Sequence, residues 1–576
     1  MSRILLTLLG ASAVGFATTA PGGAWVSTFH HLEGITAVRM NATGDVVAAG
    51  SPGVVKLRGS DGVTLWRAAD VMAGGGGISE VGGPPIAIDG TGAVLAIGAR
   101  LVSLPQGTSE LEVTKLDGNT GAAAWTVDVS DWGPGAVAVD GADDVVVAGA
   151  DLLGFGVLKL AGGDGSVLWQ YGLGAGFAWT VAVDGQGNVF AAGTLPNTPS
   201  SSGLAVVKLD GATGAQLWRH IEYPGGAFAI ALDSAGDVAT AGGPVVKLSG
   251  ADGSEQWHSA APLTGVVSVV FDAAGDVVAA GSSTSLTGSV DFTVVKLAGD
   301  TGAERWSRAL EGTTTDGNFN AAYQVAVDST GDVLAAGYFR NLGNGPVVDE
   351  DFAVVKLDGA SGDQVWRSEI NGKDTSLDRA LTLALDASDN VVAGGVLSDF
   401  SYDSVVVKMS ERIPARKLVV SDPGDVVRRK LAVAATGSGL LVIPAETSAG
   451  DPTASGATLQ LLNPSTGEQQ TIPLPAPYWK RLGAKTAGHG YVYDDKAGIA
   501  GPCQSIVLKP SGLRASCHGA LSFSLDEPSQ GSLGVVLTTG DHAGKYCMLF
   551  GSPVRDVTGS FLSKSAPQPS ACPMVP

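Results

Sequence analysis

Lysines that recur once in each of eight Val-Val-Lys-Leu-like segments are the residues that most invite a chemical role. They stand at Lys56, Lys115, Lys159, Lys208, Lys247, Lys296, Lys356 and Lys408. Eight ammonium groups brought together could hold an anion. However, side chains alternate along a strand, so each lysine lies on one face with its aliphatic stem packed along its neighbours. We therefore interpret the lysines as partners of nearby aspartates and assign no anion site to them.

Patterns that would indicate nucleophilic or acid–base catalysis are sparse. The chain has seven histidines but no Gly-x-Ser-x-Gly and no His-Glu-x-x-His sequence. The acidic pairs Asp494-Asp495 and Asp526-Glu527 could transfer protons if they faced a cleft, although solvated turns are the more common explanation. The sequence therefore assigns no catalytic, no cofactor-binding and no metal-ligating residue.

The first residues have the pattern of a secretory signal. Arg3 precedes a short apolar run from Ile4 to Ala17, and small residues follow. We expect cleavage between Ala17 and Ala24, and no later segment offers the roughly 18 uncharged apolar residues of a membrane helix. The mature protein is therefore expected to be secreted or periplasmic, with a cell-surface association as a further option.

The four cysteines all lie near the C-terminus, at Cys503, Cys517, Cys547 and Cys572. An even number in an exported chain favours two disulfides, and of the three possible connectivities we prefer pairing of sequence neighbours. Zinc is the alternative, but no Cys-x-x-Cys spacing supports it.

A repeated unit must position all these residues. In its clearest copy the unit reads VAVDSTGDVLAAG from Val325, then FAVVKLDGASGDQVW ending at Trp366. Successive lysines of the repeat are 59, 44, 49, 39, 49, 60 and 52 residues apart. Short β-branched segments between Gly and Asp at such periods predict four-stranded units stacked side by side or around a ring.

Two tight turns in each unit explain its Asp and Gly residues. An Asp-x-x-Gly sequence allows the Asp side chain to accept backbone N–H bonds two residues on, while the Gly adopts a positive φ. Asp143 and Asp389 replace this Gly in two units, and Asp tolerates a positive φ better than most residues. The Asp residues are thus predicted to shape turns.

The eighth unit ends after Met409 without reaching its tryptophan strand. A strand of the missing kind stands at the other end of the chain, around Trp25. We infer that it completes the eighth unit and closes the ring, which removes an exposed strand edge. One tryptophan per unit then packs between neighbouring units. The predicted fold is all-β: an eight-bladed β-propeller over residues 24–410 closed by an N-terminal strand, after a signal peptide at 1–23.

Residues 411–576 form a separate domain in this interpretation. The segment contains no Val-Val-Lys-Leu unit, and short alternating strands separated by Pro and Gly predict a β-sandwich-like C-terminal domain with disulfides. It carries 15 basic and 12 acidic residues, a net +3, whereas the whole chain carries −21. The propeller is therefore strongly acidic and repels phosphate backbones, so we expect no nucleic-acid partner.

The repeat resembles those of known families. Its pattern Val-Asp-x-x-Gly-Asp/Asn-Val-x-x-x-Gly, followed by Val-x-Lys-Leu-Asp-x-x-Gly-x-x-x-Trp, resembles the SBBP-type repeats of bacterial β-propellers over residues 24–410. The Thr-Gly-x-x-x-Trp half, as in Thr213 to Trp218, is similar to repeats of PQQ-like quinoprotein propellers and of the propeller subunit of outer-membrane protein assembly. Parts of the C-terminal region are similar to C-terminal modules of secreted bacterial propeller proteins.

The quinoprotein resemblance implies an oxidoreductase with PQQ and calcium at the ring axis. In the alcohol dehydrogenases of that family a disulfide between adjacent cysteines stacks on the cofactor, and this chain has no cysteine before Cys503. We therefore expect no cofactor, with calcium or PQQ as the alternative.

Long connections between units carry the extra aromatic and acidic residues. In a four-stranded blade the tight turns lie on one face, and the variable connections lie on the other, where a rigid scaffold commonly presents a binding site. The candidate binding face comprises Trp132, Trp179, Tyr223, Asp316, Tyr323, Tyr338 and Asp351. Aromatic rings with carboxylates suit sugars, peptides or cations. We expect a secreted, monomeric, non-enzymatic scaffold for an extracellular or envelope glycan or protein; the alternative is an enzyme with its site over the ring axis.

Overall fold

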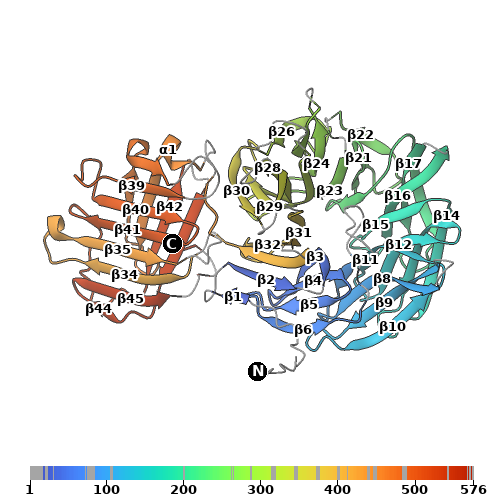
Figure 1. The fold of residues 1–576 in the computed structure, drawn as a ribbon, viewed down its shortest axis with the longest axis horizontal. Coiled ribbons are helices and arrows are strands. Elements are labelled where there is room, and N and C mark those ends of the chain that lie inside the picture. The colour runs from blue at the N-terminus through green and yellow to red at the C-terminus, as the bar shows by residue number, and fades with distance from the viewer. Residues whose placement is uncertain are drawn as a thin grey trace, which may run out of the picture.

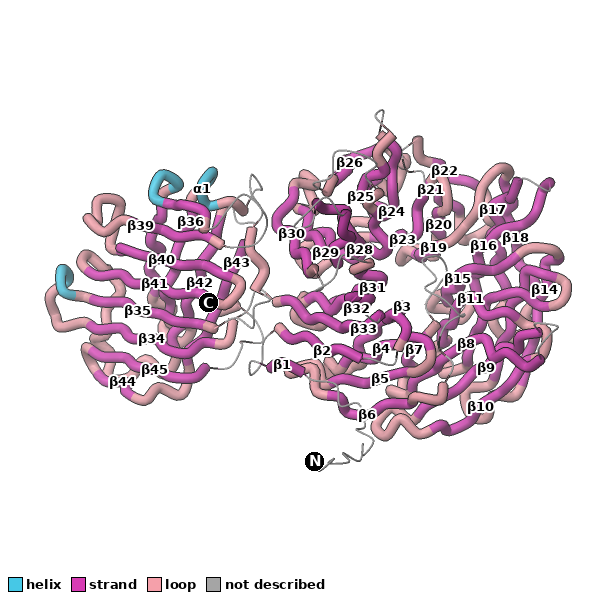
Figure 2. Tube along the Cα trace, in the orientation of Figure 1, coloured by secondary structure: helices cyan, strands magenta, loops and turns pink. Residues whose placement is uncertain are grey.

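The structure is a computed structural model of the 576-residue chain. It describes residues 17–19, 24–29, 32–71, 73, 85–103, 108–198, 201–260, 263, 265–285, 288–312, 319–342, 348–371, 377–398, 402–410, 413–436, 441–444, 450–482, 490–540, 544–566, 569 and 572–573. Apart from Ala17–Thr19, the predicted signal peptide lies outside these residues. The described chain is built almost entirely of strands, which confirms the all-β prediction (Figure 2).

The first half of the repeats forms four antiparallel sheets, each with its four strands in chain order (Figure 1). Blade 1 is β3 (Glu33–Met40), β4 (Val46–Ser51), β5 (Val54–Leu57) and β6 (Thr64–Ala68); blade 2 is β7 (Ile86–Ile88), β8 (Val94–Ser103), β9 (Thr108–Leu116) and β10 (Ala123–Val129). Blade 3 is β11 (Gly133–Val139), β12 (Val145–Asp151), β13 (Gly154–Leu160) and β14 (Val167–Gly174); blade 4 is β15 (Phe177–Val183), β16 (Val189–Thr198), β17 (Ser201–Leu209) and β18 (Gln216–Glu222).

The remaining repeats continue the ring. Blade 5 is β19 (Ala229–Leu232), β20 (Val238–Ala241), β21 (Val245–Leu248) and β22 (Glu255–His258); blade 6 is β23 (Gly265–Phe271), β24 (Val277–Thr284), β25 (Val290–Leu297) and β26 (Glu304–Leu310). Blade 7 is β27 (Ala321–Val327), β28 (Val333–Leu342), β29 (Val348–Leu357) and β30 (Gln364–Ile370). Blade 8 takes β31 (Arg379–Leu385), β32 (Val391–Ser398) and β33 (Tyr402–Met409) from one end of the propeller and β2 (Trp25–Phe29) from the other, with β1 (Ala17–Thr19) at its edge.

The seam of blade 8 lies where the sequence predicts it. Strand β2 pairs antiparallel with β33, and Trp25 stands opposite Lys408. In the other blades the tryptophan strand makes the same pairing, as with Trp169 opposite Lys159. Trp25 is fully buried, so the N-terminal strand supplies the aromatic ring that the eighth repeat lacks.

The tight turns follow the predicted chemistry. In blade 3, Oδ1 of Asp140 accepts hydrogen bonds from the N–H groups of Ala142 and Asp144, both at 2.9 Å. Asp143 stands at the turn position where most repeats have Gly, and its φ is +65°. Buried Val and Ala side chains between neighbouring sheets form the propeller core, because each blade buries both of its faces.

The C-terminal domain consists of two packed sheets. One contains eight strands in the order β38 (Trp479–Arg481), β39 (Tyr491–Asp494), β40 (Cys503–Lys509), β41 (Gly512–His518), β35 (Lys430–Ala435), β34 (Ala415–Ser421), β45 (Ser560–Ala566) and β44 (Arg555–Val557). The other contains β37 (Gln469–Leu474), β36 (Ala457–Leu462), β42 (Leu533–Thr539) and β43 (Gly544–Phe550). Short helical segments are α1 (Pro452–Ser455), η1 (Val426–Arg428) and η2 (Ala476–Tyr478). Among the described residues, no helix is long and apolar enough to cross a membrane.

Two disulfides join sequence neighbours in this domain, as expected. Cys503 bonds to Cys517 across β40 and β41, and Cys547 bonds to Cys572. The core between the two sheets contains Tyr493, Tyr546 and Phe561.

The C-terminal domain contacts the propeller beside blades 7 and 8. Trp366 forms a β-bridge with Pro444, and Ser410 forms one with Leu441. Val442 packs in the same apolar cluster as Trp366. A cavity of about 180 Å³ lies at this junction, and Lys545 contributes to its wall. The fourth strand of blade 7, β30, which carries Trp366, is therefore covered by the C-terminal domain.

Candidate functional site

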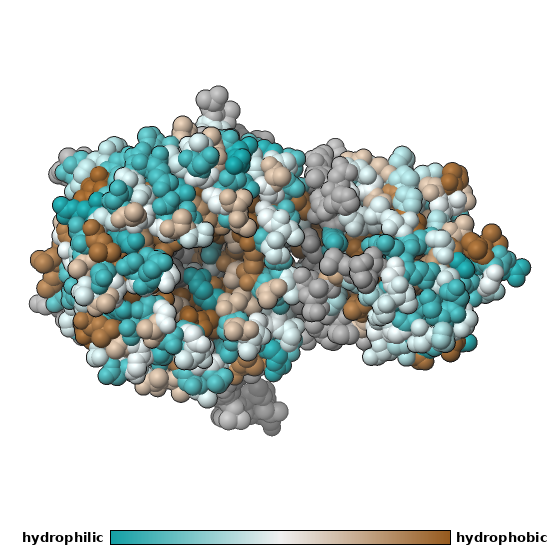
Figure 3. All heavy atoms as spheres, turned by 180° about the vertical axis from the view of Figure 1, so that it is seen from behind, coloured by the Kyte–Doolittle hydropathy of each residue, from teal (hydrophilic) through white to brown (hydrophobic). Residues whose placement is uncertain are grey.

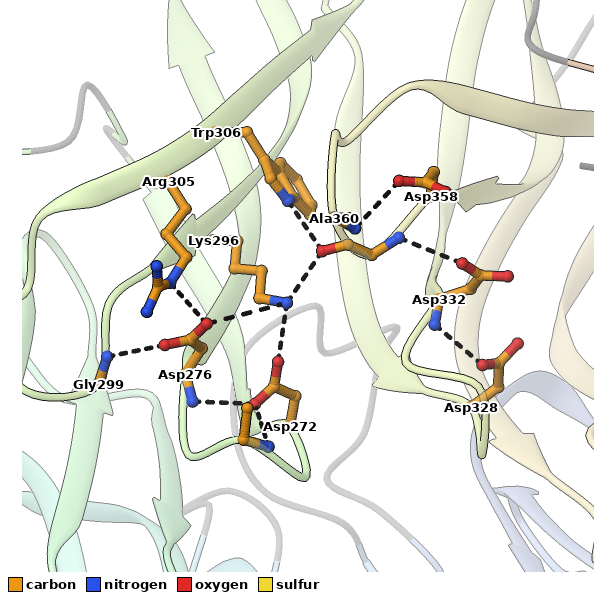
Figure 4. Close-up of polar contacts among 12 residues, drawn as sticks. Asp272, Asp276, Lys296, Gly299, Arg305, Trp306, Asp328, Asp332, Asp358 and Ala360 are labelled. Atoms are coloured by element: carbon orange, nitrogen blue, oxygen red, sulfur yellow. Dashed lines mark hydrogen bonds and ion pairs between the residues drawn. The ribbon is translucent and has the colours of Figure 1, made fainter. Parts of the chain in front are cut away.

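The recurring lysines hold neighbouring blades together. In blade 6, Lys296 Nζ lies 2.8 Å from Oδ2 of Asp272 in its own blade, and it donates a 2.9 Å hydrogen bond to the carbonyl oxygen of Gly359 in blade 7 (Figure 4). The indole Nε1 of Trp306 donates to the same carbonyl at 3.2 Å. One carbonyl oxygen thus accepts hydrogen bonds from both cross-blade donors. The ammonium group of Lys296 is therefore bound within the protein and has a structural role.

This arrangement recurs around the ring. The lysine–aspartate pairs are Lys115–Asp89, Lys159–Asp140, Lys208–Asp184, Lys247–Asp233, Lys296–Asp272, Lys356–Asp328 and Lys408–Asp386, while Lys56 pairs with Asp45 in blade 1. Burial alone would raise the pKa of Asp140, but the hydrogen bond from Lys159 and those from the turn N–H groups lower it overall. The aspartates are therefore charged partners that keep the lysines buried.

The opposite face differs from the expected set of loops. Several connections predicted as loops are instead longer strands of the central hairpin of their blade. In blade 7, β28 runs to Leu342 and β29 begins at Val348. The candidate residues Tyr338 and Asp351 consequently stand on strands. Strand pairing fixes their positions better than an irregular loop would.

Four of the predicted face residues do not contribute a described, accessible group. Tyr338 and Asp351 are only 7% and 6% exposed on their strands. Trp132 is only 2% exposed and belongs to the core between blades 2 and 3. Its ring lies over Gly156, where a Cβ atom would come within 2.8 Å of it. We therefore remove Trp132 from the candidate face. Asp316 lies outside the described residues.

Of two other predicted residues, Trp179 belongs to an aromatic group of blades 4 and 5, and Tyr223 lies just after the last strand of blade 4. The ring of Trp179 lies 4.2 Å from Phe177 and 5.9 Å from Phe228, and its Nε1 donates to Thr194 Oγ1 at 3.1 Å. Tyr223 follows β18 and remains 44% exposed. These rings are held by neighbouring blades and are partly open to solvent.

A second group, which we call the Arg–Tyr cluster, joins blades 7 and 8. It comprises Phe319, Tyr323, Tyr338, Arg340 and Arg379. The Tyr323 and Tyr338 rings are 5.8 Å apart, and the Arg379 guanidinium lies 4.6 Å from the Tyr338 ring centre. Arg340 lies 5.6 Å from the ring centre of Phe319, which is 51% exposed. Arginines over aromatic rings hold this cluster in place, and Phe319 is its exposed member.

Three carboxylates lie beneath this surface. Asp349 and Asp351 are on β29, and Asp378 immediately precedes β31. One ligand atom from each lies within 4.8 Å of the other two, and the residues are 3%, 6% and 0% exposed respectively. We call Asp349, Asp351 and Asp378 the carboxylate cluster.

Amide and guanidinium groups surround the carboxylate cluster. Asn341 Nδ2 donates to Oδ2 of Asp351 at 2.5 Å, and Asn371 Nδ2 donates to Oδ2 of Asp349 at 2.7 Å. Arg379 Nε donates to Glu350 Oε2 at 2.6 Å, which ties the Arg–Tyr cluster to the same hairpin. Burial, together with the charges of Glu369 and Asp349, raises the pKa of Asp351 to about 6, although the Asn341 hydrogen bond opposes the shift.

A mixed group of His220, Glu222 and Glu255 offers a second set of ligand atoms within 4.8 Å. Glu255 is exposed and already bonds His258 Nδ1 at 2.9 Å. The group lies on the outer strands β18 and β22. Only Glu255 of this group is exposed, while His220 and Glu222 are partly buried.

The sequence interpretation assigned no metal ligand, and it therefore missed what unites Asp349, Asp351 and Asp378. Asp351 was recognised only as part of a face. Asp378 was not singled out, because it looks like any acidic residue in a connection. The sequence does contain one signal of this grouping. Asp349 and Asp351 are two residues apart in an extended strand that ends in Val-Val-Lys-Leu, so their side chains lie on the same side of that strand.

Comparison with known proteins supports the propeller repeats. The family model described as outer membrane protein assembly factor BamB, built on PQQ-like repeats, matches residues 154–344, about a third of the chain. No curated protein matches significantly. The chain thus carries PQQ-like β-propeller repeats, as the sequence resemblance predicted.

Three solved structures to which this chain is similar have low sequence identity to it. They include BamB from Moraxella catarrhalis, with 18% identity, a TM-score of 0.41 and coverage of 66% of this chain and 100% of that one. The computationally designed Ika8 protein has 15% identity, a TM-score of 0.44 and coverage of 65% and 96%. The C-terminal WD40 domain of Sif2 has 10% identity, a TM-score of 0.44 and coverage of 69% and 100%.

Proposed function

We propose that this protein, whose chain carries PQQ-like β-propeller repeats, is an exported, non-enzymatic scaffold that binds a glycan, a peptide or a surface protein through the long-connection face of the propeller. The Arg–Tyr cluster is the observation that carries the proposal. It places the exposed ring of Phe319 beside Arg340, and Arg379 over the ring of Tyr338.

The chemistry of this cluster suits recognition more than reaction. Arg379 contacts the Tyr338 ring and Glu350, and its Nη1 donates to the Tyr323 hydroxyl at 3.4 Å. Because these groups are held before a ligand arrives, binding costs little side-chain entropy. Aromatic and arginine side chains are also the types that contribute most at binding surfaces.

Export is part of the proposal. The N-terminal residues have the pattern of a signal peptide, and the C-terminal domain contains two disulfides, which persist in oxidising compartments. The C-terminal domain would position the propeller on a larger surface, since it packs against blades 7 and 8 through Val442 and Trp366.

The test is a thermal-shift and calorimetric screen of the purified mature protein against a glycan library and a peptide library. A hit should be weakened about tenfold or more by Phe319→Ala, because truncating an anchor of this kind costs over 1 kcal/mol of binding free energy. Trp179→Ala tests the aromatic group of blades 4 and 5 in the same way.

Leu217→Ala is the matched control. Leu217 is 52% exposed, nearly the same as Phe319, but it lies on the outer strand β18. A hit that Phe319→Ala and Trp179→Ala leave intact would contradict the proposal. So would stabilisation by PQQ together with calcium, which would instead support an enzyme at the ring axis.

A further inference from the structure

We propose that Asp349, Asp351 and Asp378 bind one calcium ion, which ties the β28–β29 hairpin of blade 7 to the chain entering blade 8. The inference goes beyond the proposed binding function and does not depend on any glycan or peptide. It rests on the arrangement of buried oxygen atoms in the carboxylate cluster.

The first support is that three carboxylates converge in a buried place. Their ligand atoms lie within 4.8 Å of one another, and none of the residues is more than 6% exposed. Like charges at this separation repel strongly where water is excluded, so such a group is costly unless a cation or protons compensate it. The backbone also fixes the approach, since the N–H of Asp378 donates to the carbonyl of Glu350 at 3.0 Å.

An unsatisfied oxygen provides independent support. Oδ1 of Asp351 is buried and has no hydrogen-bond partner, while Oδ2 of the same carboxylate accepts from Asn341. A buried carboxylate oxygen without a donor is rare, because desolvation is then uncompensated. A metal ion in the carboxylate cluster would supply the missing interaction.

The charge of the surroundings matches a divalent ion. Together with the cluster, Glu350 and Glu369 bring the number of carboxylates to five, whereas the neighbouring guanidinium groups are those of Arg340, Arg367 and Arg379. Among the residues that the structure describes, the fully ionised group therefore has a net charge of −2. The three arginines form ion pairs with Glu350 and Glu369, and Arg367 also lowers the charge repulsion felt by Asp351.

The oxygen chemistry favours calcium over other cations. Carboxylate-only donors suit hard ions, and calcium accepts carboxylate ligands in flexible geometry at about 2.3–2.6 Å. Magnesium demands a near-ideal octahedron and prefers to keep several waters, which suits a buried site poorly. Backbone carbonyls and water commonly complete a calcium shell.

The preceding blade serves as an internal comparison. Counted from the lysine of their repeats, Ser289 and Asp291 of blade 6 correspond to Asp349 and Asp351. Asn320 immediately precedes β27, as Asp378 immediately precedes β31. Asn320 N–H donates to the Val290 carbonyl at 2.7 Å, the same backbone contact that Asp378 makes with Glu350.

At the place equivalent to Asp378 a neutral amide forms hydrogen bonds, while Asp291 remains a buried carboxylate whose Oδ1 also has no hydrogen-bond partner. The side chain of Asn320 donates to the Val290 carbonyl at 3.2 Å and accepts from Arg340 N–H at 2.9 Å. The same backbone frame is thus completed by a neutral amide in one blade and by carboxylates in the next. The change to Asp at two of three positions is what creates the proposed site.

The experiment uses the mature protein after removal of metals with EDTA. Calorimetric titration with CaCl₂ should give one site, and the melting temperature should rise with calcium more than with equal MgCl₂, because a ligand that binds only the folded state stabilises it. Asp378→Asn and Asp351→Asn should each weaken calcium binding about tenfold or more, since each removes one charged ligand.

Two comparisons keep the result decisive. In EDTA, Asp378→Asn should melt at the same or a higher temperature than the wild type, because it relieves repulsion and restores the residue of blade 6. Asp291→Asn, the equivalent carboxylate of blade 6, should leave calcium affinity unchanged. The assignment is overturned if the wild type binds no calcium at millimolar concentration, or if Asp378→Asn and Asp351→Asn bind it as tightly as the wild type.

Discussion

Replacing Trp25 with alanine should weaken the place where the propeller ring closes. Trp25 is fully buried, and its Nε1 donates to the Gly59 carbonyl of blade 1 at 3.1 Å. A Cβ atom on Gly62 would come within 2.6 Å of the indole, so blade 1 packs closely against the ring. The substitution therefore creates a cavity between blades 8 and 1.

The size of the effect follows from these contacts. Removing a buried aromatic side chain costs about 3–5 kcal/mol of unfolding free energy. The lost hydrogen bond adds about 1 kcal/mol. No further cost arises at Gly59, because its carbonyl keeps the 2.8 Å hydrogen bond from Lys408.

Trp66→Ala is the matched variant. Trp66 donates to the Gly118 carbonyl at 3.1 Å, and Lys56 donates to the same carbonyl at 2.9 Å. Trp66 therefore has the same kinds of partner as Trp25, in the next pair of blades. However, β6 is joined to its blade by a tight turn, whereas β2 is held in blade 8 without such a turn. Both variants should lose similar global stability, but only Trp25→Ala should release its strand locally.

Urea denaturation measures the first effect, and hydrogen exchange of the amides in Trp25–Phe29 measures the second. Trp25→Ala should lower the unfolding midpoint and speed exchange in β2, while Trp66→Ala should leave exchange in β2 near the wild-type rate. The reasoning is refuted if Trp25→Ala costs less than about 1 kcal/mol, well below the range for buried aromatic residues, or if exchange in β2 is unchanged.

Three further outcomes are expected. Lys159→Met should cost about 3–5 kcal/mol of unfolding free energy because it leaves the buried Asp140 carboxylate without its cation, and denaturation would show no such loss if the pair were solvated. The pKa values of Asp89, Asp140, Asp272 and Asp386 are lower in the folded protein than in the unfolded chain. Their stabilisation is therefore present above the unfolded pKa of about 4 and is lost as pH falls through the folded values. Melting temperatures measured from pH 7 down to pH 3 should fall most below pH 4, and a flat profile would contradict this. The double variant Cys547→Ser and Cys572→Ser should destabilise the C-terminal domain by about 3 kcal/mol, since the disulfide closes a loop of 25 residues, and calorimetry should show the propeller transition unchanged.

Features that depend on local spacing were predictable. The Asp turn of blade 3 and the positive φ of Asp143 follow from neighbouring residues alone. The displaced Trp25 also marked the seam, because a missing strand in one copy and a surplus strand elsewhere leave one simple pairing. The cysteine pairs followed from nearness in the chain.

Features that depend on contacts between blades were not predictable in the same way. Trp132 looks like a residue of an exposed connection, but the glycines of β12 and β13 leave room that its ring fills. The reach of β28 and β29 beyond the ring likewise depends on pairing between strands, which composition describes poorly.

The sequence by itself therefore determined the repeat, its turns and its closure, because each depends on residues that are close in the chain or on a count of strands. It favoured the pairing of neighbouring cysteines that the structure shows. Only the tertiary structure decided which side chains meet between blades. Asp378 reaches Asp349 and Asp351 because the chain entering blade 8 runs beside β29, as the bridge between Glu350 and Leu377 shows. Packing excludes water there, so the three carboxylates repel one another strongly. This repulsion is what favours a bound cation at that place.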